Sequence, residues 1–422
     1  MNTNDFDCAT LMSPYMVGDI LTEALTVKPP YDKDIRKADI AVRLEELQHL
    51  YEVYIPTHMT FEIYSKMYFS LQSSLKKKTG RNVILQRNVN SQMLLTGRTT
   101  NHSGFGKKQG IIGGNDSFSI IGVSGIGKSA AIERSIQMIG GESIISMVNP
   151  YQQVIPILAV QTPFDCSPKG MLLGILQETD KMLQTHYYQN AIQARATQDM
   201  LIGSVSQVCL NHIGLLVVDE IQNIIENRNG RNLVGMLTQL INSSGVSLCF
   251  VGTPEAASFF EQTPYLARRT IGLYFGPMEY DDEFRHIVKV LLDYCYTARG
   301  CSNKEALLSA AHEYSGGIIS NVISLIHDAQ ETAILSGREI LDLRSIDDAW
   351  KTRMGMLHGS IQRNVVPQGS FHKAVTVPTQ IPAQADEGTE TAPVSLAILA
   401  FQEEDVLIAA RGAGLIETEI AL

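Results

Sequence analysis

The feature that most constrains the fold is the segment Gly122-Val-Ser-Gly-Ile-Gly-Lys-Ser129, which follows an apolar run at 118–121 and precedes helical spacing over 130–139. In this order of strand, loop and helix, consecutive backbone N–H groups surround a phosphate at the start of the helix. Lys128 is expected to bind the β- and γ-phosphates of ATP, and the Ser129 hydroxyl to bind Mg²⁺. A glycine-rich turn that binds nothing is the alternative. The residues predicted to contact the nucleotide are Gly122, Val123, Ser124, Gly125, Ile126, Gly127, Lys128, Ser129 and Ala130.

An acidic pair ends a second apolar run. The run at 213–218 is typical of a buried parallel strand, and Asp219 and Glu220 follow it directly. In a nucleotide hydrolase, Asp219 would hold Mg²⁺ through water and Glu220 would polarise the attacking water. The alternative is a strand that ends at a solvated acidic turn. The phosphate-binding segment upstream favours the catalytic interpretation.

Two more candidates lie further along the chain. Thr253 follows the apolar run 246–252, and a resemblance to the plan of AAA+ ATPases implies that its hydroxyl lies beside the attacking water. Capping of a helix start before Pro254 is the alternative for Thr253, and both roles can hold. Arg268 and Arg269 precede the run 271–275. The order of these segments resembles the plan of AAA+ ATPases, and this resemblance implies that one of the two arginines reaches the nucleotide of a neighbouring subunit, a contribution worth roughly 10³–10⁵ in rate. The other would form a surface ion pair, and the sequence does not say which is which.

The spacing of apolar residues predicts an α/β domain followed by helices. Strands are expected at 118–121, 154–161, 213–218, 246–252 and 271–275, and helices at 35–54, 61–75, 130–139, 169–183, 191–209 and 232–241. Such alternation indicates a parallel sheet with helices on both faces. Later helices, which predict a lid, are expected at 282–296, 304–314, 318–335 and 345–354. The expected divisions are an N-terminal extension 1–115, a nucleotide-binding core 116–277, a helical lid 278–358, and a linker and tail 359–422.

The charge distribution indicates one candidate binding segment. The net charge of −10 disfavours non-specific nucleic-acid binding, yet residues 63–115 contain nine Lys or Arg and no Asp or Glu. This glycine-rich segment is either a solvated surface or a contact for a phosphate backbone or an acidic partner. The tail after residue 365 is expected to be a linker that ends in an acidic-apolar docking peptide, or a helix packed on its own domain.

Cysteine usage and hydropathy favour a cytoplasmic protein with no membrane partner. The six cysteines are scattered without a Cys-x-x-Cys pair, which argues against a zinc site and for a reducing compartment. No apolar run is long enough to cross a bilayer, and the first residues lack a signal-peptide pattern.

The whole plan resembles that of AAA+ ATPases, and three segments resemble the TnsC/TniB family of transposition regulators, especially its TnsC branch. These segments are Gly214-Leu-Leu-Val-Val-Asp-Glu-Ile-Gln222, Val251-Gly-Thr-Pro-Glu255 and Ala267-Arg-Arg-Thr270. The resemblance spans residues 18–355, is strongest over 118–275, and does not include the tail.

This resemblance implies an ATP-dependent switch on DNA. Members of the family assemble with ATP and Mg²⁺ into rings or spirals on double-stranded DNA. They bind a target-selecting protein of TniQ or TnsD type, activate the transposase, and disassemble on hydrolysis. Lys169 would contact the DNA backbone without reading sequence, and Lys107 and Lys108 would add to that contact. An exposed lysine at a helix start is the alternative for Lys169. Whether target selection is RNA-guided, as in CRISPR-associated transposons, stays open.

The sequence departs from the family pattern in the lid. Many AAA+ proteins have an arginine soon after the lid's glycine pair, whereas Gly316-Gly317 is followed by Ile-Ile-Ser-Asn, and the next arginine is Arg338. We therefore expect slow hydrolysis.

Two other functions fit the same motifs. One is a helicase loader, which would prefer single-stranded DNA, and the other is an adaptor that binds ATP without hydrolysing it. The presence of Glu220 argues against the adaptor.

Overall fold

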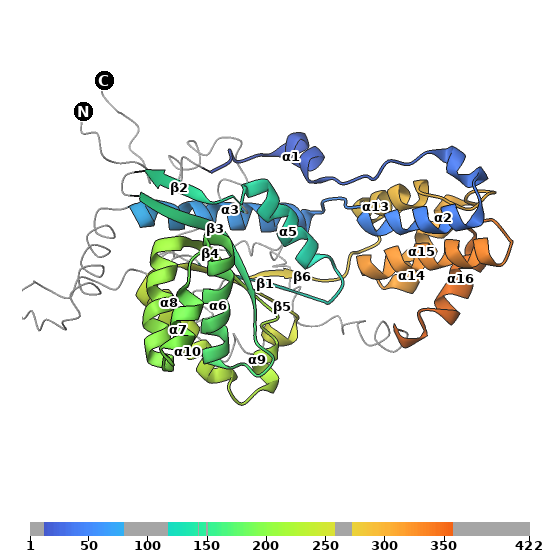
Figure 1. Ribbon diagram of the computed structural model, residues 1–422. Coiled ribbons are helices and arrows are strands. Elements are labelled where there is room, and N and C mark those ends of the chain that lie inside the picture. Colours follow the sequence, from blue (N-terminus) through green and yellow to red (C-terminus); the bar gives the residue numbers. More distant parts are fainter. Residues whose placement is uncertain (1–11, 80–116, 142, 149–150, 258–271, 358–422) are drawn as a thin grey trace, which may run out of the picture. The chain divides into compact units, whose positions relative to one another are not determined.

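The computed structural model describes residues 12–79, 117–141, 143–148, 151–257 and 272–357 (Figure 1). The chain divides into two compact units, Met1–Val365 and Val366–Leu422, and every described residue belongs to the first. Several predicted features lie outside the described residues: the basic segment from 80 onward with Lys107 and Lys108, the pair Arg268 and Arg269, and the tail.

A six-stranded sheet forms the centre of the described core. Its order is β2-β3-β4-β5-β1-β6, and all neighbouring strands are parallel except β2 and β3. Because β1 lies beside β5 and β5 lies beside β4, the loops that follow these three strands meet at one edge of the sheet. The strands are Phe118–Gly122 (β1), Ile145–Val148 (β2), Tyr151–Gln161 (β3), Ile213–Asp219 (β4), Ser247–Gly252 (β5) and Leu273–Phe275 (β6).

Helices cover both faces of the sheet, since successive side chains of a strand point to opposite sides. Leu216 and Val218 of β4 pack with α6, α8 and α10, whereas Leu215 and Val217 pack with α3 and α5. Figure 1 shows these two layers on either side of the sheet. The helices are His58–Thr79 (α3), Lys128–Ile139 (α5), Pro168–Leu183 (α6), Tyr187–Gln193 (α7), Gln198–His212 (α8), Asn223–Glu226 (α9) and Gly230–Ser244 (α10).

The helices after the sheet form the lid, which has its own hydrophobic cluster around Phe284, Leu308 and Ile326. Asp281 caps the first of them by accepting a hydrogen bond from Phe284 N at 2.9 Å. The lid contains Asp282–Asp293 (α13), Lys304–Ser315 (α14), Ile319–Leu335 (α15), Leu343–Thr352 (α16) and the 3-10 helix Gly355–Leu357 (η4).

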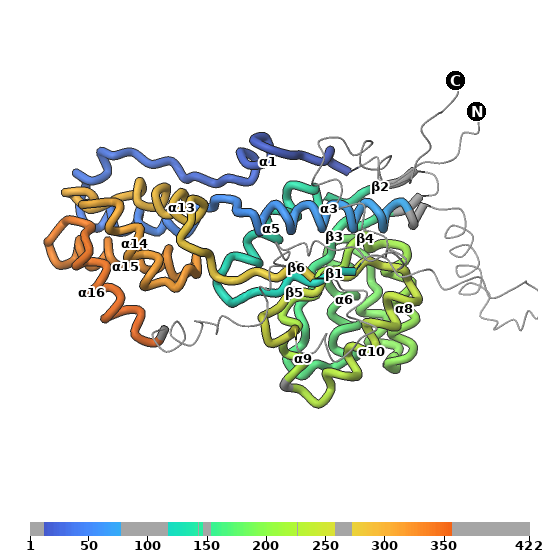
Figure 2. The backbone as a smooth tube through the Cα atoms, turned by 180° about the vertical axis from the view of Figure 1, so that it is seen from behind, coloured from blue at the N-terminus to red at the C-terminus, as the bar shows by residue number. Residues whose placement is uncertain are grey.

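The segment before α3 contributes to both hydrophobic regions. Its elements are Gly18–Leu25 (α1), Lys33–Lys37 (η2), Ile40–Glu46 (α2) and Leu47–Glu52 (η3). Leu21 and Leu25 of α1 pack with α3 and α5, whereas Leu47 and Leu50 of η3 are fully buried in the lid cluster. In Figure 2 this segment runs alongside the lid helices, and the chain then enters α3, which lies along the sheet.

The predicted α/β fold, a mostly parallel sheet between helices followed by a helical bundle, is confirmed. Three local predictions are wrong. A strand, β2, pairs antiparallel with β3 where none was expected. The single helix expected over 191–209 is two helices, because Arg195 has a φ of 48° and Thr197 caps α8. The helix expected over 35–54 is the succession of η2, α2 and η3.

Candidate functional site

The segment between β1 and α5 turns tightly around the start of the helix. Gly125 and Gly127 have φ angles of 83° and 96°, in the left-handed region that favours glycine. Ala131 N donates to Gly127 O at 2.9 Å, so regular helical bonding begins directly after the turn. The first N–H groups of α5 therefore lie at the carboxyl edge of the sheet, where an anion is stabilised.

Lys128 is held by the segment that contains it. Its ammonium donates to Gly122 O at 2.7 Å and to Val123 O at 3.0 Å. Burial lowers the pKa of Lys128, and the neighbouring carboxylates of Asp219, Glu220 and Glu255 oppose that shift. Among the described residues, the hydrogen-bond partners of the Lys128 ammonium are backbone carbonyls, so the phosphates of a ligand would supply the negative charge that these partners lack.

The acidic pair ends β4 beside this turn. The Asp219 carboxylate accepts a hydrogen bond from Glu220 N at 2.8 Å. The Asp219 carbonyl accepts from both N and Oγ1 of Thr162, at 2.9 and 2.8 Å, which fixes the end of the strand. Glu220 is exposed and has a φ of 56°, uncommon for a residue other than glycine. The turn, rather than the regular strand, thus sets the direction of the Glu220 side chain.

One cavity of about 290 Å³ joins the predicted nucleotide-binding and catalytic groups. Lys128, Ser129, Asp219, Glu220 and Thr253 all line it. The hydroxyl and carboxylate oxygens of Ser129 and Asp219 are hard ligands of the kind that Mg²⁺ prefers, so the donor set fits that ion. The other lining residues are Ser124, Gly125, Gly127, Ala130, Gln222, Gly252 and Ser320.

A second, mainly apolar cavity of about 490 Å³ adjoins the first. The two share Gly125, Gly127, Ala130 and Ser320 as lining residues. Polar groups thus surround one part of the combined space and apolar groups the other, as a nucleotide with its phosphates and base requires. The walls of this second cavity come from four parts of the chain: the N-terminal segment (Val27, Val53, Tyr54, Ile55), the start of α3 (Met59), α5 (Glu133, Arg134) and the lid (Ile287, Leu291, Ile319, Ile323). Ile126 also lines it.

The N-terminal wall of this second cavity is fixed by local bonds. Val27 and Tyr54 exchange two backbone hydrogen bonds of 2.8 and 2.9 Å. The Tyr54 hydroxyl is hydrogen-bonded with Thr60 Oγ1 at 2.8 Å, and the Arg134 guanidinium lies 5.7 Å from the centre of the Tyr54 ring. Burial raises the pKa of Tyr54 to about 12, so this wall carries a neutral phenol at physiological pH.

The lid contacts the phosphate-binding turn through Ser320. Its backbone N–H donates to Gly125 O at 3.0 Å, and a Cβ added to Gly125 would collide with its hydroxyl. Ser320 belongs to the Ile-Ile-Ser-Asn run that follows the glycine pair. Among the described residues, no arginine lines the 290 Å³ cavity, in agreement with the departure noted in the sequence.

The end of β5 brings Thr253 and Gln222 together. Gln222 Oε1 accepts a hydrogen bond from Thr253 N at 3.3 Å, and Gln222 Nε2 donates to Glu220 Oε2. The Thr253 side chain is hydrogen-bonded to Glu255, and this bond lowers the pKa of the Glu255 carboxyl. Sequence reasoning gave no role to Gln222, although it is part of the motif after Asp219.

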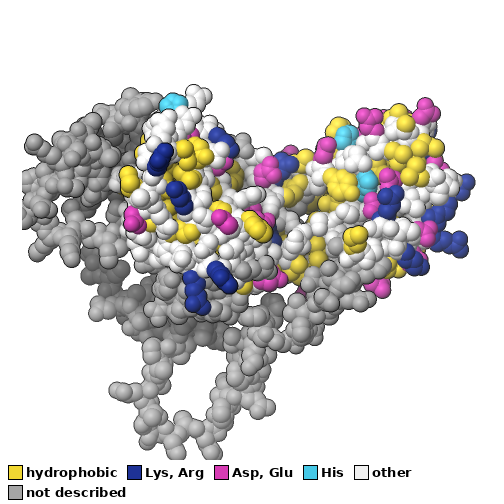
Figure 3. Space-filling model, turned by 60° about the horizontal axis from the view of Figure 1, so that its bottom comes forward, with side chains coloured by type: hydrophobic (Ala, Val, Ile, Leu, Met, Phe, Trp, Pro, Cys, Tyr) yellow, Lys and Arg dark blue, Asp and Glu magenta, His cyan; other side chains and the backbone are white. Residues whose placement is uncertain are grey.

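Of the three lysines predicted to contact DNA, only Lys169 lies within the described residues. Lys169 is exposed in the first turn of α6, after the cap formed by Ser167 Oγ and Gly170 N at 3.1 Å. Lys107 and Lys108 lie outside the described residues. On the face seen in Figure 3, basic and acidic side chains of the described residues are mixed.

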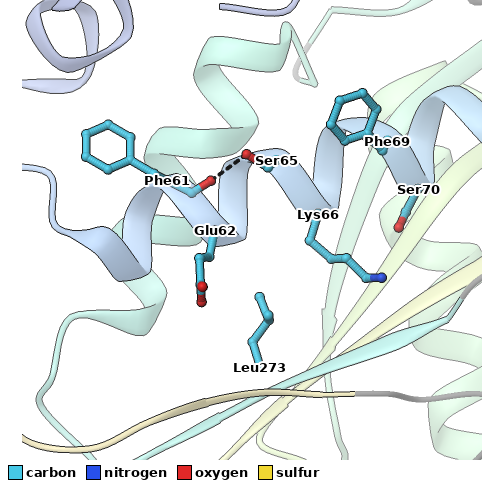
Figure 4. A pocket seen from close by; sticks show the side chains of 7 residues that line it. All are labelled: Phe61, Glu62, Ser65, Lys66, Phe69, Ser70 and Leu273. Carbon is cyan, nitrogen blue, oxygen red and sulfur yellow. Dashed lines mark hydrogen bonds between the residues drawn. The ribbon is translucent and has the colours of Figure 1, made fainter. Parts of the chain in front are cut away.

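A separate groove of about 460 Å³ lies between α3 and β6 (Figure 4). Phe61, Phe69 and Leu273 give it an apolar lining, and its charged groups are Glu62 and Lys66. Ser65 Oγ donates to Phe61 O at 2.8 Å, as the dashed line in Figure 4 shows. None of the predicted site residues lines this groove.

Two contributions to the site could not be found from the sequence. The first is the pair of side chains Gln222 and Ser320. Both belong to motifs considered in the sequence, but their contacts join segments that are far apart along the chain. The apolar wall from 53–55 lies in a stretch whose helical periodicity was misleading. No pattern in that stretch pointed to a ligand.

One family model matches the part of the chain that forms most of the sheet. Residues 114–273 match the model of the bacterial TniB protein family. The predicted resemblance to this family is thereby confirmed over those residues, which contain the phosphate-binding segment and the strands β1, β4 and β5. No curated protein matches the chain.

Two solved structures illustrate the similarity of this chain to known folds. The Aeropyrum pernix ORC1 protein in complex with DNA has 16% identity and a TM-score of 0.41, and the match covers 63% of each chain. The Walker-type ATPase PABY2304 of Pyrococcus abyssi has 12% identity and a TM-score of 0.38, covering 59% of this chain and 71% of its own. No helix within the described part of the chain has the length and hydropathy needed to cross a membrane.

Proposed function

We propose that this protein is an ATP-hydrolysing regulator of DNA transposition that assembles on duplex DNA. The observation that carries the proposal is the convergence of Lys128, Ser129, Asp219, Glu220 and Thr253 on one cavity that continues into an apolar one. The match of residues 114–273 to the bacterial TniB family directs this ATPase chemistry toward transposition.

The polar cavity would receive the phosphates. The N–H groups of the turn and of the first residues of α5 would bind the β-phosphate, and Lys128 would exchange its carbonyl partners for phosphate oxygens. Ser129 and Asp219 would hold Mg²⁺, which when bound neutralises charge on the phosphates. The adenine would occupy the apolar cavity against the walls from 53–55 and the lid.

Hydrolysis would use Glu220 and Thr253. The Glu220 carboxylate would orient and polarise a water for attack on the γ-phosphate, a role worth about 10²–10⁴ in rate. Thr253 would bind the same water from the end of β5. In this interpretation, the absence of an arginine from the described lining of the cavity keeps turnover slow.

Assembly would complete the site. Arg268 and Arg269 precede β6, and one of them would enter the nucleotide site of the next subunit, so that ATP stabilises contacts between copies. Lys169, Lys107 and Lys108 would contact DNA phosphates, which makes binding independent of sequence and sensitive to salt. The assembled form would join a target-selecting protein to the transposase and come apart after hydrolysis.

Mass photometry and electron microscopy of the full chain test this function. With a non-hydrolysable ATP analogue and duplex DNA, we expect closed or spiral oligomers, and with ADP mostly smaller species. Replacing both Arg268 and Arg269 by alanine should reduce assembly and lower turnover by at least about tenfold. A particle that stays monomeric under all conditions would contradict the proposal. A clear preference for single-stranded DNA would favour a helicase loader.

A further inference from the structure

The Gln222 side chain connects the two groups expected to orient the attacking water. Its Nε2 donates to Glu220 Oε2, and its Oε1 accepts from Thr253 N at 3.3 Å. A carboxylate can only accept and a backbone N–H can only donate, so a single orientation of the amide satisfies both partners. Gln222 thus joins the end of β4 to the end of β5 across the lining of the phosphate cavity.

The backbone around Gln222 is arranged for this contact. Ile221, which is 2% exposed, donates its N–H to Val251 O at 3.0 Å, and this bond attaches the turn to β5. Gly252 leaves the space that the amide needs. A Cβ at position 252 would lie 2.9 Å from Gln222 Oε1 and 2.7 Å from Ile221 Cγ2. Gly252 therefore makes room for the same contact that Gln222 forms with Thr253, although the two residues belong to different sequence motifs.

We propose that Gln222 is a positioning residue that holds the Glu220 carboxylate at a fixed place relative to Thr253. This inference rests on the proposed ATPase function and adds a residue that acts through Glu220. The exposed Glu220 side chain has several rotatable bonds, and without a partner it would sample many directions in solvent. The amide uses one carboxylate oxygen and leaves the other for water.

The expected consequence is a specific loss of catalytic rate. Misplacement of a catalytic group by about 1 Å can cost roughly a hundredfold in rate, whereas nucleotide affinity depends on other contacts. Replacing Gln222→Met keeps a side chain of similar length without the two hydrogen bonds. We expect kcat for ATP to fall by at least about tenfold, with KM changed by less than about twofold.

Phosphate release by the full chain, with Mg²⁺ and with and without duplex DNA, measures this effect. Gln222→Glu is a second variant that keeps the shape but replaces the donor by a carboxylate, which repels Glu220, so it should also lower kcat. Gln177→Met, on the exposed face of α6, is the matched control and should leave kcat unchanged. Thermal midpoints and the Kd of a fluorescent ATP analogue establish whether each variant is folded and binds nucleotide.

A combined variant separates positioning from a general structural role. Glu220→Ala removes the carboxylate that Gln222 is proposed to hold, and Gln222→Met added to it should change the residual kcat by less than about twofold. Two outcomes would overturn the inference while leaving the ATPase function standing. One is a further tenfold fall in kcat when Gln222→Met is added to the Glu220 variant. The other is a kcat equal to that of the unmodified protein for both Gln222 variants. Negligible turnover of the unmodified protein, equal to that of Glu220→Gln, would instead remove the proposed function and this inference with it.

Discussion

At the scale of single residues, the ion pair of Arg43 and Glu339 joins the N-terminal segment to the lid. Two hydrogen bonds of 2.6 and 2.8 Å connect the guanidinium to the carboxylate. Arg43 is 4% exposed and also donates to Tyr296 O at 3.1 Å, while the Glu339 carboxylate accepts from Ala298 N at 3.1 Å. Because Arg43 is buried and the Glu339 side chain is largely covered, removal of one partner would leave the other charge poorly solvated, at a cost in stability.

Arg43→Met should therefore destabilise the protein by about 3–5 kcal/mol at neutral pH. Arg43 lowers the pKa of Glu339 below its usual 4.5, so the pair's stabilisation is present above that pH and lost as pH falls through it toward the lower folded-state pKa. In the variant this acid-dependent loss should largely disappear. Urea denaturation at pH 7 and near pH 4 measures both effects.

The exposed pair of Arg338 and Asp348 offers the matched control. Its side chains are 33% and 48% exposed, and Arg338→Met should cost less than about 1 kcal/mol. Equal losses for the two variants would show that burial does not set the strength of the Arg43 pair.

Site residues could be predicted from the sequence where the residues that identify them are neighbours along the chain. Lys128 and Ser129 belong to a contiguous motif, and Asp219 and Glu220 follow an apolar run, so their neighbours in sequence define the site. The contact of Gln222 with Thr253 joins residues that are far apart in sequence, and its existence depends on the pairing of β4 with β5. The sequence alone does not give such a contact.

At the scale of elements, η3 is part of the lid although it precedes the sheet in the chain. Leu47 and Leu50 are fully buried among lid side chains, and Val53, the residue directly after η3, belongs to the same cluster and also lines the apolar cavity. The helix α3 that follows packs on the sheet through Ile63 and Leu71. The N-terminal segment therefore connects both hydrophobic regions and forms part of the proposed nucleotide site.

Leu50→Ala tests this role of η3. Removal of a fully buried leucine leaves a cavity, and we expect a loss of about 2–5 kcal/mol in the free energy of unfolding. Because Val53 to Ile55 follow directly, nucleotide affinity should fall as well. Leu335→Ala, at a position that is 59% exposed on α15, should change stability by less than about 0.5 kcal/mol. A similar small change for Leu50 would mean that η3 does not belong to the lid core.

The elements that the sequence predicted well have strong periodicity and ordinary lengths. The strands β1, β4 and β5 are buried on both faces and appear in the sequence as mostly apolar runs. The break between α7 and α8 was missed because it depends on the left-handed backbone of Arg195, for which the residue type gives little signal. The short helices over 33–52 owe their form to packing against the lid rather than to their own propensity.

At the scale of the whole molecule, three parts of the chain that are distant in sequence surround one binding space. The core supplies the phosphate-binding turn and the acidic strand end, and the lid supplies Ser320 and the apolar wall of α15. The N-terminal segment supplies Tyr54 and its neighbours. A ligand in this space would contact all three parts, so nucleotide binding is expected to stabilise their packing.

The central claim is that this space binds ATP and that Glu220 hydrolyses it. The most direct test measures binding and turnover separately for two variants of the full chain. Lys128→Ala should weaken binding of a fluorescent ATP analogue by at least about tenfold, because a charged partner of the phosphates is lost. Glu220→Gln should bind the analogue as tightly as the unmodified protein while phosphate release falls by about a hundredfold. Unchanged turnover in Glu220→Gln, or unchanged affinity in Lys128→Ala, would contradict the account.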